Sequence, residues 1–346
     1  MSDSSLPLVS VVIPAFNPPA ELFKSCIDSV TSQSYENLEI IVVDDGSQRD
    51  YASLIDRITA GDIRVHVVRQ ENAGEGGARN TGIENANGKY VMFVDADDGL
   101  APGWIETAVR LATEDDSDIV MGKVMQVPIV PPPNENRGCG AVDSKVFREY
   151  DFWQLQRDFL LISSSLLPGL DYLDPGVCSK LVCRDCIGDL RFPVGIKLSS
   201  DQVFNHGMLR RAKRYVVTNK LAYYYVSNGD SVSHIYNPDA APTMMKSMGL
   251  IKPLLIDNEE VKQAFCFRVL LEIGNAIQFA AFSEKCSMGF RERARIIREI
   301  SGEPLLQEVL TEMDILKLPE RSWRIKAFLL RHHLGALYAI IKGATD

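Results

Sequence analysis

Acidic, amide and glycine residues gather at the ends of four short apolar runs in the first hundred residues. They occupy residues 14–17, 44–47, 72–80 and 95–98. Carboxylates bind divalent cations, glycine-rich backbone approaches phosphate closely, and arginine pairs with phosphate oxygens. Because these groups recur in this order, they predict one site for a phosphorylated ligand and a cation.

Two carboxylates, Asp95 and Asp97, flank Ala96 after the fourth run. Side chains two residues apart on a strand point to the same side, so these two would repel each other without a cation between them. Magnesium or manganese fits such oxygen ligands and neutralises charge on a diphosphate. The alternative is a solvated acidic turn.

Asp45 ends the second run, and Arg79 lies in a helical pattern opened by Gly74, Gly76 and Gly77. A strand-end aspartate accepts hydrogen bonds from a base or ribose, or else caps its own turn. A glycine-rich helix start favours phosphate, which Arg79 would bind; the alternative for Arg79 is a surface salt bridge.

These residues need a scaffold that brings the run ends together. The pattern predicts a mostly parallel α/β sheet flanked by helices, whose ligands bind beyond the carboxyl ends of the strands. The predicted strands span 8–13, 38–43, 63–68, 90–94 and 118–122, and the predicted helices span 19–34, 50–60, 76–87 and 102–114.

The chain beyond residue 125 is less regular. Four prolines predict a loop over 127–136, and a helix over 199–211 precedes an extended segment over 214–226. Helices with short polar breaks follow from 242. We expect a main domain over 1–236, with a nucleotide-binding half at 1–125 and an acceptor half at 126–236, and a helical C-terminal region over 237–346.

Composition narrows the function classes. The chain has 346 residues, 46% apolar and 24% charged, which is typical of a globular protein. Its net charge of −9 disfavours general nucleic-acid binding. Seven thinly spread cysteines predict a reducing cytoplasmic compartment. We expect no signal peptide, and no membrane span, because no run reaches the roughly 18–20 apolar residues needed.

The motifs resemble those of family-2 glycosyltransferases of the GT-A fold, of the kind that builds bacterial polysaccharides. The resemblance is close over 8–125 and looser over 175–235. The matching stretches are VSVVIPAFN at 9–17, LEIIVVDDGS at 38–47, NAGEGGARNTG at 72–82 and GKYVMFVDADD at 88–98.

The resemblance implies a nucleotide-sugar donor, most often a UDP-sugar, a Mn²⁺ or Mg²⁺ ion and transfer with inversion. It also implies the donor-site residues. Pro14, Ala15 and Asp45 hold the base, Asn72 and Arg79 lie near the base, ribose and diphosphate, Asp95 faces the ribose, Asp97 binds the metal, and Asn17 and Ala96 belong to the same motifs.

An inverting transfer needs a base for the acceptor hydroxyl. Relatives carry Glu-Asp before a helix with a phenylalanine three residues on, so the resemblance implies Asp201, followed by Phe204, with Ser200 in place of the glutamate. Ser199 and Gln202 predict a capping box, which puts Asp201 in a first helical turn where the dipole favours its ionised form. The alternative is an aspartate that only stabilises the helix.

Three further features carry open alternatives. The resemblance implies that His234 binds the metal or the diphosphate; the alternative is a structural histidine. Lys180 also matches a family position, and it either faces the acceptor or packs inside the protein. Arg324 and Arg331 share one face of a predicted C-terminal helix over 323–342. That face contacts an anionic membrane with a lipid-linked acceptor, or packs on its own domain or a subunit partner of a homo-oligomer.

The leading hypothesis is a metal-dependent inverting glycosyltransferase at the cytoplasmic face of the plasma membrane, acting on a glycan or lipid-linked acceptor. A sugar nucleotidyltransferase would need a glycine-rich, basic first loop, which residues 14–19 lack. A non-catalytic sugar-nucleotide-binding or scaffolding relative stays open because Ser200 replaces the expected glutamate.

Overall fold

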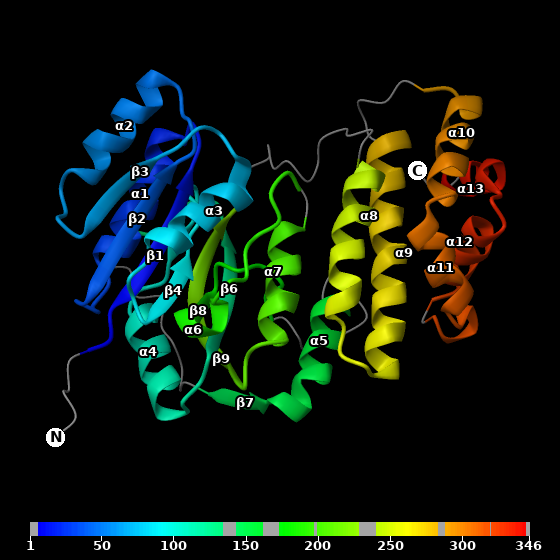
Figure 1. Ribbon diagram of the computed structural model, residues 1–346. Coiled ribbons are helices and arrows are strands. Elements are labelled where there is room, and N and C mark those ends of the chain that lie inside the picture. The colour runs from blue at the N-terminus through cyan, green and yellow to red at the C-terminus, as the bar shows by residue number, and fades with distance from the viewer. Residues whose placement is uncertain are drawn as a thin grey trace. The chain divides into compact units, whose positions relative to one another are not determined.

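The computed structural model in Figure 1 describes residues 6–133, 143–161, 173–196, 199–227, 240–282, 288–318 and 320–343. The chain divides into two compact units. The first comprises Met1–Phe152 and Gly169–Asn228 and contains a sheet, and the second comprises Trp153–Pro168 and Gly229–Asp346 and is helical.

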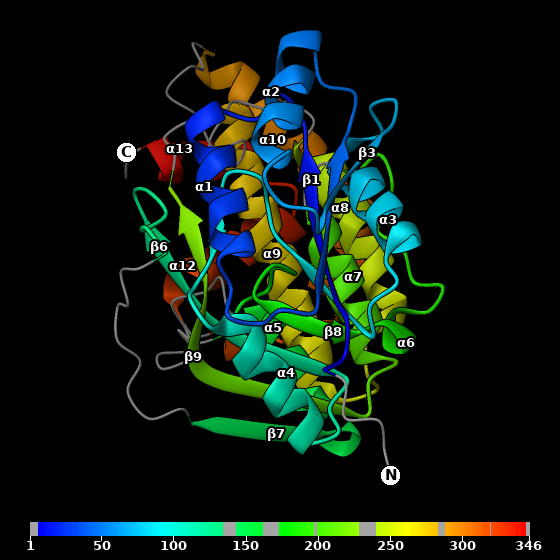
Figure 2. The same cartoon turned by 90° about the vertical axis from the view of Figure 1, so that its left-hand side faces the viewer.

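Among the described residues, the sheet has nine strands in the order β3-β2-β1-β4-β8-β6-β9-β5. Strand β7 pairs with β9 and lies beside it in Figure 2. The first three strands and β4 run parallel, as do β6 and β9, whereas β8 runs antiparallel to both of its neighbours. The strands are β1 Val9–Ala15, β2 Leu38–Asp44, β3 Val65–Arg69, β4 Tyr90–Phe93, β5 Gly99–Leu100, β6 Ile119–Val127, β7 Ser144–Arg148, β8 Lys180–Cys183 and β9 Arg214–Val226.

The predicted strands and helices of the first 125 residues are all present, with ends shifted by a few residues. Strands β1 and β4 are buried at every position, as expected where helices cover both faces of a sheet. The helices of this unit are α1 Ala20–Thr31, α2 Arg49–Thr59, α3 Gly74–Asn85, α4 Trp104–Glu114, α6 Arg184–Ile187 and α7 Ser200–Leu209.

Helix α3 lies directly on β1 at Gly82. A Cβ atom there would stand 2.1 Å from Cγ1 of Val12. We therefore expect Gly82→Ala to lower the free energy of unfolding by about 1–3 kcal/mol through overpacking, measured by urea denaturation. Gly61→Ala is the matched control, because a Cβ atom at Gly61 meets nothing within 4 Å. Equal stability of the two variants would contradict the close approach of α3 and β1.

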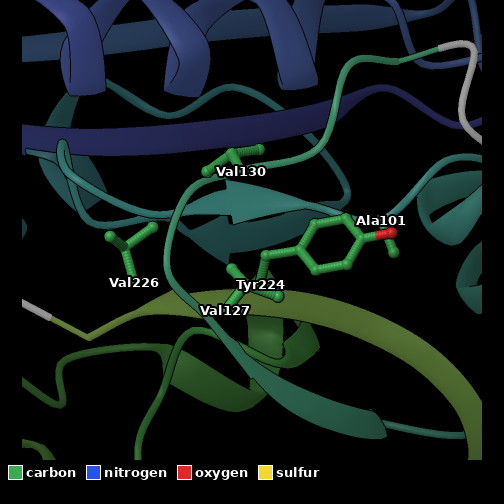
Figure 3. Close-up of a cluster of buried hydrophobic side chains, with 5 residues drawn as sticks. All are labelled: Ala101, Val127, Val130, Tyr224 and Val226. Carbon is green, nitrogen blue, oxygen red and sulfur yellow. The ribbon is translucent and has the colours of Figure 1, made fainter.

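Strand β9 separates the core from a cavity described below. Tyr224 points into a cluster of buried side chains, whereas Tyr223 and Tyr225 line the cavity, because successive strand side chains face opposite sides. Figure 3 shows the cluster, which joins the region after β5 to the ends of β6 and β9 and comprises Ala101, Val127, Val130, Tyr224 and Val226.

The helical unit includes α5, because Gln156 donates to the carbonyl oxygen of Leu254 and accepts from the amide of Ile256. Helices α8 and α9 run side by side in this unit (Figure 1). The helices are α5 Phe152–Leu161, α8 Ala240–Ile251, α9 Glu259–Ala281, α10 Phe290–Ser301, α11 Pro304–Glu312, α12 Arg321–Arg331 and α13 Gly335–Gly343. The predicted boundary between residues 236 and 237 lies outside the described residues.

Helix α9 is long and apolar enough to cross a membrane, with a mean hydropathy of 1.3 over 18 residues. The sequence analysis missed it because Arg268 and Glu272 interrupt the apolar run. These two side chains pair with each other at 2.5 Å, and 78% of the apolar window is buried inside the protein. That burial is typical of the core helix of a helical domain.

The C-terminal segment over 323–342 is helical, as predicted, and forms two helices. The chain ends α12 at Arg331 and begins α13 at Gly335, and His333 between them has a positive φ of 53°. Arg331 donates to the carbonyl oxygen of Met313, whereas Arg324 donates to that of Leu318. The two arginines therefore do not form one free basic face.

Candidate functional site

A cavity of about 440 Å³ opens in the sheet unit, and three of the predicted site residues line it. Arg79 comes from α3, Asp95 from the segment after β4 and Asp201 from α7. Glu75 and Asp174 also line the cavity. The guanidinium of Arg79 and several carboxylates thus line the same cavity.

Arg79 is buried, with 3% of its side chain exposed, so a surface salt bridge is the wrong interpretation. Its Nη2 donates to Oδ1 of Asp95 at 2.7 Å and pairs with Glu75, and its guanidinium lies 5.3 Å above the ring of Phe192. Burial opposes its charge, but Asp95 and Glu75 outweigh burial and hold the pKa of Arg79 well above its usual value. Arg79 is therefore a fixed positive charge in the cavity wall.

Three packed aromatic rings connect the segments that carry these residues. The rings of Phe192 and Phe204 stack at 4.0 Å, and the ring of Phe93 meets both edge-on. Asn80 fixes Phe192 by accepting from its amide at 2.8 Å and donating to its carbonyl at 2.9 Å. Because Phe93 ends β4 and Phe204 lies on α7, the rings set α3, β4 and α7 relative to one another.

Glu75 is a site residue that the sequence analysis missed. It lines the cavity and pairs with Arg79 one helical turn later. Burial raises the pKa of Glu75 to about 7, although the guanidinium of Arg79 opposes the shift. The i, i+4 spacing of Glu75 and Arg79 was the available signal, although the predicted helix began one residue after Glu75.

Asp201 lies in the first turn of α7, as predicted, but the capping box is wrong. Ser199 has a left-handed φ of 63° and its side chain makes no capping bond, so Asp201 itself accepts from the amide of Gln202 at 2.8 Å. The expected stabilisation of its ionised form is also wrong in direction, because burial raises the pKa of Asp201. A raised pKa makes this carboxylate a stronger proton acceptor.

The wall beside Asp201 is held by Lys180, whose side chain is completely buried. Its Nζ donates to the carbonyl oxygens of Asp174 and Gly176, so it packs under the wall, the second of its two predicted roles. Asn205 of α7 donates to the same Gly176 carbonyl at 2.8 Å. Asn205 therefore links this wall to α7, the helix that carries Asp201.

Asp45 is buried at the start of α3. Its carboxylate accepts from Gln70 Nε2 at 2.6 Å and from the amides of Ala73 and Gly74 at 2.8 and 2.9 Å. Asp45 thus caps α3, the helix that carries Arg79. Asn72 joins this group by donating to the Asp45 carbonyl at 3.0 Å.

Pro14 and Ala15 end β1 beside β2, and the Ala15 carbonyl accepts from the Asp45 amide at 2.9 Å. Asn17 follows with a φ of 45°, and its side chain accepts from the amide of Gln48 at 2.8 Å. These three residues, Asp45 and Asn72 form a rim beyond the ends of β1 and β2, but they do not line the cavity.

Asp95, Ala96 and Asp97 lie in a turn, because β4 ends at Phe93, so the strand alternation that was expected to put Asp95 and Asp97 on one side does not apply. The amide of Asp98 closes this turn on the carbonyl of Asp95 at 3.1 Å. Burial and the charge of Asp95 raise the pKa of Asp97, as expected for crowded carboxylates.

Two carboxylates in one turn suit Mg²⁺ or Mn²⁺, since such ions take one or two protein carboxylates and complete their shell with phosphate oxygens and water. Among the described residues, no three His, Cys, Asp or Glu side chains are placed to hold an ion. His234, the other predicted ligand, lies outside the described residues. The donor set therefore fits a metal shared with a phosphorylated ligand.

Asp98 ties the same turn to β9. Its Oδ2 accepts from the hydroxyl of Tyr223 at 2.8 Å and its Oδ1 accepts from the amide of Val226 at 2.7 Å. The Tyr223 hydroxyl also accepts from the amide of Asp95 at 3.1 Å. Burial, with a contribution from Asp95, raises the pKa of Asp98 to about 8.

We expect Asp98→Asn to change how stability depends on pH. Between about pH 4 and 8 the folded protein keeps a proton on Asp98 that the unfolded chain releases, so the contribution of Asp98 to stability falls as pH rises through this window. Asparagine does not titrate. The melting temperature of the variant minus that of the wild type should therefore rise from pH 5 to pH 8 in buffer with a chelator. A difference independent of pH would contradict the raised pKa.

A known protein family matches the part of the chain that carries much of this site. The model described as "Glycosyl transferase family 2" matches residues 10–164, which hold β1 to β4 and the residues of the rim, Arg79 and Asp95. Residues 10–164 thus match glycosyltransferase family 2. The predicted resemblance is confirmed.

Alignments with curated glycosyltransferases cover more of the chain than residues 10–164. Glycosyltransferase GlyA of Streptococcus pneumoniae is 28% identical over 85% of the chain and 42% of its own length. The uncharacterized glycosyltransferase YibD of Escherichia coli is 32% identical over 66% of the chain and 64% of its own length. The chain therefore spans less than two thirds of the length of either relative.

Solved structures confirm the predicted fold. Residues 1–349 of S. aureus TarS in complex with UDP-GlcNAc superpose with a TM-score of 0.67 at 19% identity, covering 98% of this chain and 91% of that one. The chain thus has a GT-A fold, with a central sheet flanked by helices and a helical C-terminal region.

Proposed function

We propose that the chain is an inverting glycosyltransferase of polysaccharide biosynthesis. It moves a sugar, a hexose, from a UDP-sugar to a hydroxyl of a glycan or lipid-linked acceptor. The observation that carries this proposal is that Arg79, Asp95 and Asp201 line the same cavity. Arg79 can bind an anion there, and Asp201 can accept a proton. Family membership and the UDP-GlcNAc bound to TarS support a nucleotide-sugar donor.

In this proposal the rim holds the nucleotide. Asp45 already accepts three hydrogen bonds, and a carboxylate offers about four acceptor positions, so one is left for an N–H of the base. Pro14, Ala15 and Asn17 border the base, while Asn72 lies between base and ribose. Arg79, the sixth residue of the helix that Asp45 caps, binds the diphosphate through charge-assisted hydrogen bonds.

Asp97 is the proposed protein ligand of the Mn²⁺ or Mg²⁺ ion, together with His234, and Asp95 faces the ribose. When bound, the ion neutralises negative charge that builds up on the leaving diphosphate. The carboxylates at this turn are otherwise crowded, as the raised pKa of Asp97 indicates. A bound cation would relieve that repulsion.

Asp201 is the proposed base. Its carboxylate takes the proton of the acceptor hydroxyl as the hydroxyl oxygen bonds to the anomeric carbon, and the bond from that carbon to the diphosphate breaks on the opposite face. Attack opposite the leaving group inverts the anomeric centre. The raised pKa of Asp201 supports this role, because burial favours its protonated product.

Release of UDP or GDP from a panel of nucleotide-sugars, with and without Mn²⁺, tests the proposal. We expect one UDP-sugar to be hydrolysed or transferred in the presence of Mn²⁺, and the activity to be lost in Asp97→Ala. Donor binding by calorimetry without turnover on any acceptor would instead favour a sugar-nucleotide-binding module.

We place the enzyme in the cytoplasm, at the inner face of the plasma membrane.

A further inference from the structure

Strand β9 presents two tyrosines to the cavity, and their side chains differ in how they are held. The hydroxyl of Tyr223 donates to Asp98 at 2.8 Å and accepts from the amide of Asp95, and the residue is buried. Tyr225 lines the same cavity and is 43% exposed, and within the described part of the chain no hydrogen bond or ring contact holds its side chain. Tyr223 is therefore part of the frame of the cavity, whereas the ring of Tyr225 is open to a ligand.

The register of β6 against β9 puts an apolar side chain beside that ring. Val124 of β6 lies opposite Tyr223, and Tyr225 follows two residues later on the same face of β9. Val124 and Tyr225 both line the cavity. The face of an aromatic ring is electronegative and attracts weakly positive C–H groups. One face of a pyranose ring presents such C–H groups together, whereas an open-chain polyol has no such face.

Asp174 can accept a hydrogen bond from a ligand in the same cavity. Its carboxylate accepts from the amide of Gly176 at 2.9 Å and from the hydroxyl of Ser179 at 2.7 Å, and its Oδ2 lies 3.7 Å from Nζ of Lys180. A carboxylate offers about four acceptor positions. Because the side chain is 19% exposed and lines the cavity, a position is left for a sugar hydroxyl.

The charges of the lining disfavour an anionic acceptor. Among the described residues that line the cavity, the basic side chain is that of Arg79, and the acidic ones are Glu75, Asp95, Asp98, Asp174 and Asp201. In the proposed function Arg79 binds the diphosphate of the donor, so this lining offers no second cation to the acceptor. A phosphate or carboxylate next to the reacting hydroxyl would face like charges at Asp174 and Asp201.

We propose that Tyr225 is the stacking platform for the acceptor, and that the acceptor presents an uncharged pyranose ring to it. The sugar ring lies on Tyr225 beside Val124, one of its hydroxyls donates to Asp174, and the reacting hydroxyl reaches Asp201. The role as acceptor rests on the proposed function, but the fit of a pyranose ring to Tyr225 does not require turnover.

Saturation-transfer NMR on the full chain, with UDP and Mg²⁺ present, tests this inference. The neutral probes are the methyl pyranosides of glucose, galactose and N-acetylglucosamine, with methyl glucuronide as an anionic ring and glucitol as an open chain. We expect at least one neutral pyranoside to bind, methyl glucuronide to bind more weakly and glucitol not to bind. Binding of none of the neutral pyranosides, or equal binding of glucitol or methyl glucuronide, would overturn the proposal.

Substitutions at Tyr225 test the platform itself. Tyr225→Ala should weaken binding of the pyranoside by about tenfold, and raise the acceptor KM by the same factor with little change in kcat, because a stacking contact is lost. Tyr225→Phe keeps the ring and should bind like the wild type. Tyr150→Ala is the matched control, since Tyr150 is an exposed tyrosine of the same unit outside the cavity lining. Equal pyranoside binding by Tyr225→Ala and the wild type would assign no platform to Tyr225.

Calorimetry with UDP separates this inference from the proposed function. All three variants should bind UDP like the wild type, because neither tyrosine belongs to the proposed donor residues. If UDP binds and no pyranoside does, the platform is wrong and the donor site stands. If UDP does not bind, the proposed function fails, while pyranoside binding that Tyr225→Ala abolishes would still support the platform.

Discussion

Asp201→Asn is expected to lower the rate of sugar transfer by about 10²–10⁴-fold while donor affinity stays the same. Asparagine has the same size and still accepts from the amide of Gln202, so α7 keeps its first turn. It takes no proton from the acceptor hydroxyl. The rate is measured as UDP release with acceptor present, and donor affinity by calorimetry.

The alternative that Asp201 only stabilises its helix makes a different prediction. Asp50 is an exposed acid in the first turn of α2 and serves as the control for that role. If Asp201 were only a helix stabiliser, Asp201→Asn and Asp50→Asn would both lower the melting temperature slightly and leave transfer intact. Unchanged transfer in Asp201→Asn would remove Asp201 from the role of base.

Arg79→Met is expected to weaken donor binding by about tenfold to 150-fold, which corresponds to a charged hydrogen bond worth about 1.5–3 kcal/mol. The guanidinium is the buried positive charge of the cavity, and methionine leaves Glu75 and Asp95 facing the diphosphate without it. The melting temperature should fall as well. Calorimetric titration with UDP measures the affinity.

Arg268→Met is a matched control for the loss of stability. Arg268 is 4% exposed and pairs with Glu272 at i, i+4 in the helical unit, as Arg79 pairs with Glu75 in the sheet unit. We expect Arg268→Met to lower the melting temperature and to leave UDP affinity unchanged. Equal UDP affinity in Arg79→Met and the wild type would make Arg79 a purely structural cation.

The fold of the first 125 residues could be predicted because its strands are long apolar runs between clear helical patterns. Strand β9 was equally legible, and the predicted extended segment over 214–226 coincides with it. Strands β5 and β8 were missed because two and four residues carry too little periodicity. Their positions depend on pairing with distant strands, which local sequence does not encode.

The site was predictable in its parts and less so in its contacts. Motif spacing located Arg79 and Asp95, and resemblance located Asp201, all of which line one cavity. The raised pKa of Glu75 and the support that Lys180 gives to the cavity wall arise from tertiary packing. The sequence alone did not exclude the capping box, because Ser199 is not a glycine and yet has a left-handed backbone conformation. In the structure, Asp201 instead accepts a hydrogen bond from the amide of Gln202.

A crystal structure of the chain with UDP and Mn²⁺ tests the central claim most directly. The account predicts uracil at Asp45, the diphosphate within hydrogen-bond distance of Arg79 and the ion on Asp97. It also predicts that the Asp201 carboxylate faces the vacant sugar position of the same cavity. A nucleotide bound away from this cavity, or a diphosphate that touches neither Arg79 nor a metal on Asp97, would contradict it.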